Sequence, residues 1–117
     1  MPATIPNEFL DQMAEKFRAL GDATRLAILR ALMAGERNVS QVVAETGRGQ
    51  ANISKQLKIL AEAGLVVRRK EGLQVFYRLG DPLVERLCQL VCETIAQEAQ
   101  EEIDRRRKLL HGWTAKR

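Results

Sequence analysis

Two short segments with helical periodicity are separated only by the turn Gly47-Arg48-Gly49. The first begins near Ser40, and Gly47 lies where a left-handed residue ends a helix. The second runs from about Gln50 to Ala63 and is closed by Gly64. Two helices joined by so short a glycine-containing turn form a helix-turn-helix unit. This junction limits the chain to a few helical folds.

Two further helices are expected before this unit. Phe9, Met13 and Phe17 recur every four residues, which indicates an amphipathic helix over 7–20 that ends at Gly21. Asp22 is placed to cap the next helix, which extends to Gly35. Its buried side is expected to comprise Leu26, Ile28, Leu29, Leu32 and Met33.

The periodicity changes after Gly64. Residues 65–69 and 74–79 are rich in Val, Leu, Phe and Tyr, and the glycine between them suits the turn of a β-hairpin. Asp81-Pro82 then begins a long helix. The apolar residues of its first half cover about 200° of the circumference. One neighbour cannot cover so wide a face, so we expect this helix to contact both its own subunit and a second one.

A helix-turn-helix followed directly by a basic hairpin is typical of a winged helix. We therefore expect a mostly α protein with five helices and a small β-hairpin as the wing, in which the fifth helix contacts a second subunit. Residues 1–6 are expected to be a flexible arm, 7–96 the DNA-binding and dimerisation domain, and 97–117 a C-terminal helical extension and tail.

Composition excludes several classes of function. The 117 residues are 45% hydrophobic and include two cysteines, which fits one globular domain without a disulfide scaffold. No apolar run approaches the roughly 18 residues of a membrane span, so we expect a cytoplasmic protein with reduced thiols and no membrane partner. There is no Cys-x-x-Cys motif, Gly-rich phosphate loop or βαβ pattern. We therefore expect no catalytic residues and no enzymatic activity.

The net positive charge of the chain comes from the window that contains the helix-turn-helix and the hairpin. Seven basic and two acidic residues lie from Arg48 to Arg78, an excess of five, whereas the rest of the chain has a net charge of −1. Such a window is expected of an electrostatic footprint for phosphate. The candidate DNA contacts are Gln50, Asn52, Ser54, Lys55 and Lys58 on the second helix of the unit and Arg68, Arg69 and Lys70 on the hairpin.

These residue types suit the reading of double-stranded DNA. Gln50 and Asn52 can pair bidentately with adenine edges in the major groove, while Ser and Lys reach bases or phosphates. The hairpin cations would reach phosphates or the minor groove. A solvated polar helix face, or a winged helix used for protein contact, is the alternative. The coincidence of helix order, short turn and positive window favours DNA.

Three stretches of the chain resemble the ArsR/SmtB family of small dimeric winged-helix repressors. They are Leu20–Leu29, Gln50–Leu57 and Leu60–Val66, and the resemblance spans roughly Phe9 to Ile95. It implies a homodimer joined through the first and fifth helices, repression by occupying an operator, and release on sensing a metal ion, metalloid or oxidant.

The sensing sites implied by that resemblance are incomplete in this sequence. Members that bind metal at the third helix carry a Cys-x-Cys type box, but residues 38–43 hold no thiol or imidazole. Members with zinc or nickel on the last helix use Asp and His pairs, but the single histidine is His111. We expect His111 to be a solvated tail residue.

Cys88 and Cys92 remain as candidate sensors. Residues four apart lie on one side of a helix with Cα atoms about 6 Å apart, so the two thiols could share a soft ion. Two subunits related by a two-fold axis would bring four thiolates together. Four thiolates suit Zn or Cd, and three of them suit As(III). Oxidation to a disulfide is a second option, and it would distort the helix or link two subunits. A third is that both cysteines are core residues and another inducer acts. No resident cofactor is required.

Overall fold

The computed structural model describes residues 4–115 as two compact units, divided after Val84. The first contains α1 (Asn7–Leu20), α2 (Ala23–Met33), β1 (Arg37–Asn38), α3 (Val39–Thr46), α4 (Gln50–Glu62), β2 (Val66–Glu71) and β3 (Gln74–Leu79). The second is formed by α5 (Leu83–Ala115) beyond its first two residues. No helix in the described residues is long and apolar enough to cross a bilayer.

The ends of the expected arm and tail, residues 1–3 and 116–117, lie outside the described residues. Residues 4–6 precede α1 without regular secondary structure, and the predicted extension from residue 97 continues α5 as far as Ala115. The domain boundaries proposed from the sequence stay predictions.

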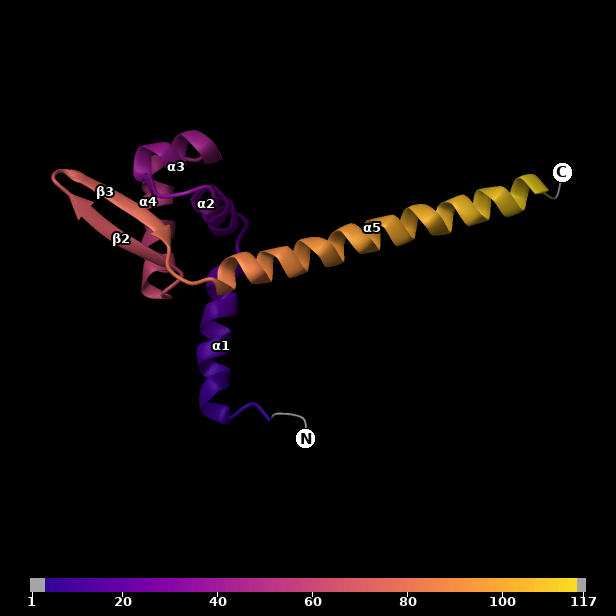
Figure 1. Ribbon diagram of the computed structural model, residues 1–117, viewed down its shortest axis with the longest axis horizontal. Helices are drawn as coiled ribbons and strands as arrows, with labels where there is room; N and C mark the ends of the chain where they lie inside the picture. Colours follow the sequence, from indigo (N-terminus) through magenta and orange to yellow (C-terminus); the bar gives the residue numbers. More distant parts are fainter. Residues whose placement is uncertain (1–3, 116–117) are drawn as a thin grey trace. The chain divides into compact units, whose positions relative to one another are not determined.

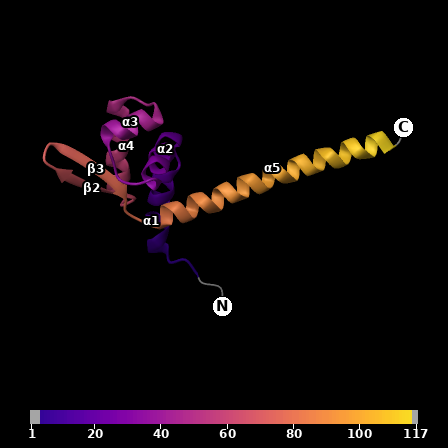
Figure 2. The same ribbon diagram turned by 45° about the horizontal axis from the view of Figure 1, so that its top comes forward.

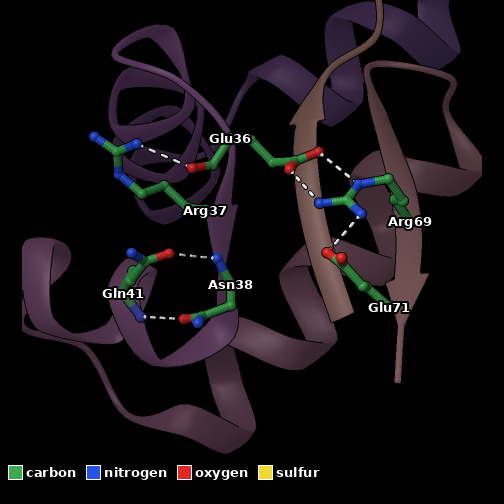
Figure 3. Close-up of polar contacts among 6 residues, drawn as sticks. All are labelled: Glu36, Arg37, Asn38, Gln41, Arg69 and Glu71. Atoms are coloured by element: carbon green, nitrogen blue, oxygen red, sulfur yellow. Dashed lines mark hydrogen bonds and ion pairs between the residues drawn. The ribbon is translucent and has the colours of Figure 1, made fainter. Parts of the chain in front are cut away.

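Local side-chain chemistry fixes where the helices begin and end. Asp22 caps α2 as predicted, because its Oδ2 accepts from the Arg25 backbone N–H at 3.0 Å. Gly47 ends α3 with φ of 69°, the left-handed conformation expected of it. The start of α3 differs by one residue from the prediction, because Asn38 and Gln41 form a reciprocal capping box that begins the helix at Val39 (Figure 3).

The core of the first unit lies among α2, α3, α4 and the base of the wing. Its fully buried side chains are Ile28, Leu29, Val42, Ile53, Leu57, Leu60, Leu65 and Val84. Of the residues predicted to be buried on α2, Ile28, Leu29 and Leu32 are buried and Met33 is half-buried. The prediction for Leu26 was wrong, because this side chain is 40% exposed. Apolar residues surround more of α2 than its neighbours cover, so hydrophobicity alone does not identify the buried side.

The wing is a three-stranded antiparallel sheet with the order β1-β3-β2. Arg68 pairs with Tyr77 and Arg69 with Phe76 across β2 and β3, and β1 adds Arg37 opposite Tyr77. Figures 1 and 2 show the β2–β3 hairpin beside α4. The sequence predicted the hairpin but not β1, because a two-residue strand is too short to show alternation.

In the second unit, α5 is a single helix of 33 residues. Asp81 caps its start as predicted, with Oδ1 accepting from the Leu83 backbone N–H at 2.9 Å. Farther along, Glu102 forms ion pairs with Arg105 and Arg106, which lower the pKa of the Glu102 carboxyl. Their i,i+3 and i,i+4 spacings place these partners on one face of the helix.

Candidate nucleic-acid interface

The recognition-helix candidates lie on the outer side of α4. The buried residues Ile53, Leu57 and Leu60 fix which side of the helix faces the core. The exposed polar residues of its first three turns are Gln50, Asn52, Ser54, Lys55 and Lys58. The acidic residue of α4 is Glu62, at its C-terminal end. The first three turns therefore present amide, hydroxyl and ammonium groups that can meet base edges or phosphates.

An open groove separates this face of α4 from the wing. It has a volume of about 530 Å³ and is lined by Ser54, Lys58, Ala61, Glu62, Arg68 and Tyr77. Ser54 and Lys58 from α4 and Arg68 from β2 are thus brought together, although they are distant in the sequence. Two cations facing one groove form an attractive site for a phosphate backbone, and Glu62, which also lines the groove, reduces its positive charge.

The three basic residues of the hairpin do not share one face. Successive side chains of a strand point to opposite sides of the sheet. Arg68 is opposite the buried Tyr77 and lines the groove, so Lys70, two residues on, is on the same side of β2. Arg69 points the other way. In the sequence the three residues form one basic run. In the strand, Arg68 and Lys70 lie on one face of the sheet and Arg69 lies on the other.

Arg69 is engaged by two carboxylates and a ring. Its Nη2 and Nε donate to the two oxygens of Glu36 at 2.6 and 3.2 Å, and Nη1 donates to Glu71 at 2.9 Å (Figure 3). The guanidinium also lies 4.8 Å from the centroid of the Phe76 ring. Arg69 lies on an edge strand, Phe76 on the central strand, and Glu36 immediately before the other edge strand. This side chain therefore ties together both edges of the wing.

The ion pair changes the titration of its members. The hydrogen bond from Arg69 lowers the pKa of Glu36, and the carboxylates raise the pKa of Arg69. Both groups are therefore charged at neutral pH. The role of Glu36 could not be predicted from the sequence, because a carboxylate 33 residues from its partner leaves no local pattern.

A second contact missed from sequence involves Gln56 on α4. Arg25 donates from Nη1 to Gln56 Oε1 at 2.9 Å, and Gln56 donates from Nε2 to Asn52 Oδ1 at 3.0 Å. The i,i+4 spacing of Asn52 and Gln56 could have indicated the second bond. The first requires the packing of α2 against α4.

The two cysteines differ in exposure. Both are free thiols, Cys88 half-buried and Cys92 exposed. Burial, followed by the neighbouring Cys92, raises the pKa of the Cys88 thiol. Within residues 4–115 no three His, Cys, Asp or Glu side chains are placed to hold a metal ion together. A four-thiolate site would need two copies of α5.

The helix-turn-helix, its polar outer helix and the basic groove beside the wing define a winged-helix DNA-binding protein. Comparison with known proteins gives the family. Residues 22–67 match the family model described as bacterial regulatory protein, arsR family. A probable mercury resistance operon repressor of Streptomyces lividans is 38% identical over 88 residues, which cover 75% of this chain and 70% of that protein.

Two solved structures share the fold. One is the homodimeric winged helix-turn-helix domain of Mb0332 from Mycobacterium bovis, described as a possible ArsR-family regulator, with 36% identity and a TM-score of 0.68 over 84% of this chain and 92% of that one. The other is the AntR antimony-specific transcriptional repressor, with 28% identity and a TM-score of 0.76 over 85% and 90%. The chain belongs to the ArsR family: it is a DNA-binding transcriptional regulator and not an enzyme.

Proposed function

We propose that this regulator is a homodimeric repressor that occupies a double-stranded operator and leaves it when a thiol-reactive effector acts on Cys88 and Cys92. The observation that carries the first part is the groove lined by Ser54, Lys58 and Arg68 beside the exposed face of α4. In this proposal, α4 enters the major groove while the wing contacts the flanking backbone. A regulator working on DNA in this way acts in the cytoplasm.

The proposed contacts divide by role. Gln50, Asn52 and Ser54 lie at or near the start of α4 and read base edges, while Lys55 and Lys58 reach bases or phosphates. Arg68 and Lys70 contact phosphate from the wing. Arg69 differs from the sequence-based expectation: we assign it to holding the wing, because its donors already face Glu36 and Glu71.

Exposed apolar side chains support the dimer. On α1, Phe9 and Phe17 are 55% and 56% exposed, and on α5 Val91 and Ile95 are 55% and 59% exposed. Monomeric proteins rarely leave such stripes open to water. The homodimeric state of the similar Mb0332 domain favours a second copy as the partner. Two recognition helices would then meet successive major grooves about 34 Å apart.

The chemistry of the thiols supports a soft effector. Cys88 and Cys92 lie one helical turn apart and both are free. Similar proteins are described as a probable mercury resistance operon repressor and an antimony-specific transcriptional repressor. Mercury and antimony both favour thiolate ligands. As(III), Cd or Zn would fit the same donors. Oxidation of the pair is the alternative effector, and structural cysteines with another inducer is the second alternative.

The DNA-binding part is tested by selecting duplexes from a randomised pool with the reduced protein and measuring binding at several salt concentrations. We expect a two-fold symmetric consensus and a steep fall in affinity with salt, because neutralised phosphates release counterions. Gln50→Ala should relax sequence preference, with Gln97→Ala on the exposed distal part of α5 as its control. Binding without sequence preference or salt dependence would favour a protein-contact module.

The sensing part is tested on the selected operator by adding arsenite, cadmium or peroxide in turn to the wild type, Cys88→Ser and Cys92→Ser. We expect release by one class of reagent that fails in the Cys88→Ser variant. If every reagent leaves the affinity unchanged, the cysteines are structural and the inducer is another molecule. The DNA-binding conclusion stands in either case.

A further inference from the structure

Arg25 fixes the orientation of the Gln56 carboxamide. The Arg25 guanidinium donates to Ala19 O at 2.7 Å, Arg18 O at 2.9 Å and Gln56 Oε1 at 2.9 Å, so it is held between the end of α1 and the side of α4. Arginine carries donors only. The oxygen of Gln56 must therefore face Arg25, and its NH₂ group must face away.

The orientation of Gln56 in turn fixes that of Asn52. The NH₂ group of Gln56 lies 3.0 Å from Asn52 Oδ1. A donor at this distance requires an acceptor, so Oδ1 of Asn52 faces Gln56. The Asn52 side chain is exposed, and its Nδ2 donates no hydrogen bond to any group within residues 4–115. The outer group of Asn52 is therefore an NH₂ donor.

We propose that the chain Arg25–Gln56–Asn52 sets the base specificity of α4, with Gln56 as the positioning residue that makes Asn52 a hydrogen-bond donor to DNA. This rests on the proposed entry of α4 into the major groove. Guanine, adenine and thymine each present an acceptor there, whereas cytosine presents only its N4 donor. Asn52 accordingly rejects cytosine on the strand that it reads. The residue type alone suggests that Asn52 pairs bidentately with adenine. In this proposal its NH₂ group instead donates to a single acceptor on the base.

The substitution Gln56→Glu reverses the direction of the hydrogen bond between residues 56 and 52. A carboxylate has acceptors only, so one oxygen keeps the Arg25 bond and the other faces Asn52. Asn52 then turns its NH₂ group toward Glu and presents Oδ1 to the DNA. The base accepted at this position becomes one with a donor, and cytosine is the most diagnostic of these.

The experiment is duplex selection from a randomised pool with the full-length chain. The position read by Asn52 is the one whose preference is lost in Asn52→Ala. In Gln56→Glu we expect the ratio of cytosine to guanine at that position to rise about tenfold or more, as one matched hydrogen bond replaces a mismatched one. Gln97→Glu adds the same charge on the distal part of α5, away from the proposed DNA and dimer contacts, and should leave the ratio unchanged.

Other results would overturn the proposal. An unchanged ratio of cytosine to guanine in Gln56→Glu excludes the positioning role. An Asn52→Ala variant that keeps the wild-type base preference at every position excludes it as well. A cytosine preference that persists in the double variant Gln56→Glu, Asn52→Ala means that Glu reads the base itself. If Gln56→Glu does not fold, Gln56→Leu removes the anchor and should bring the ratio toward one; a ratio equal to that of the wild type contradicts the proposal. Selection of no consensus by the wild type would instead refute the proposed function.

Discussion

Arg69 and Glu36 are joined by two hydrogen bonds across the wing although 33 residues separate them in the chain. The guanidinium lies over Phe76 of the central strand, so one side chain connects both edges of the sheet. Arg68, its neighbour in sequence, lines the groove beside α4. Adjacent arginines of the same strand thus have different surroundings.

This division predicts different salt dependences for two variants. Arg68→Ala should weaken DNA binding and reduce the slope of log affinity against log salt by about one, because one phosphate contact is lost. Arg69→Ala should weaken binding while leaving the slope unchanged, because its loss loosens the wing without removing a phosphate contact. Titrations at four or more salt concentrations check both. Equal slope changes in the two variants would show that Arg69 also contacts phosphate.

The Glu36–Arg69 pair predicts a pH-dependent contribution to stability. The pKa of Glu36 is lower in the folded protein, so its contribution is present above the unfolded pKa and lost as pH falls through the folded pKa. We expect Glu36→Gln to lower the unfolding temperature at pH 7, and the difference from the wild type to shrink in acid. Glu98→Gln on α5 is the control. A deficit that is constant from pH 7 to pH 3 would contradict the ion-pair explanation.

The core position of Leu57 predicts a large loss of stability when its side chain is shortened. Leu57 is fully buried on α4, whereas Leu73 at the tip of the wing is fully exposed. Leu57→Ala should reduce the free energy of unfolding by about 2–5 kcal/mol through lost burial and a cavity. Leu73→Ala should change it by less than about 0.5 kcal/mol. Denaturant unfolding followed by circular dichroism measures both, and similar losses would refute the packing described.

The turn of the helix-turn-helix predicts opposite effects for one substitution at two glycines. Gly47 has φ of 69°, and Gly49 has φ of −67° at the N-cap of α4. Gly47→Ser should cost about 1 kcal/mol, because a side chain disfavours the left-handed conformation. Gly49→Ser should be neutral or slightly stabilising, since serine is a good N-cap. Thermal melts of the two variants decide the matter, and a loss in both would mean that the turn rejects any side chain.

Much of the architecture could be predicted from local chemistry. Asp22 and Asp81 cap helices where they were expected, and Gly47 ends α3 in the left-handed conformation. These features depend on a residue and its near neighbours, so they are visible in sequence. The outer face of α4 was equally predictable, because the period of Ile53, Leu57 and Leu60 identifies the buried side.

The sequence by itself thus determined the helix order, the turn, the wing hairpin and the polar composition of the recognition helix, since each rests on interactions a few residues apart. Only the tertiary structure decided which of the polar side chains are available. It placed Arg68 in the groove and Arg69 against Glu36, and it joined Arg25 to Gln56. The physical reason is that a donor meets a distant acceptor only after packing has brought their elements together. The periodicity of the sequence does not predict such contacts between distant residues.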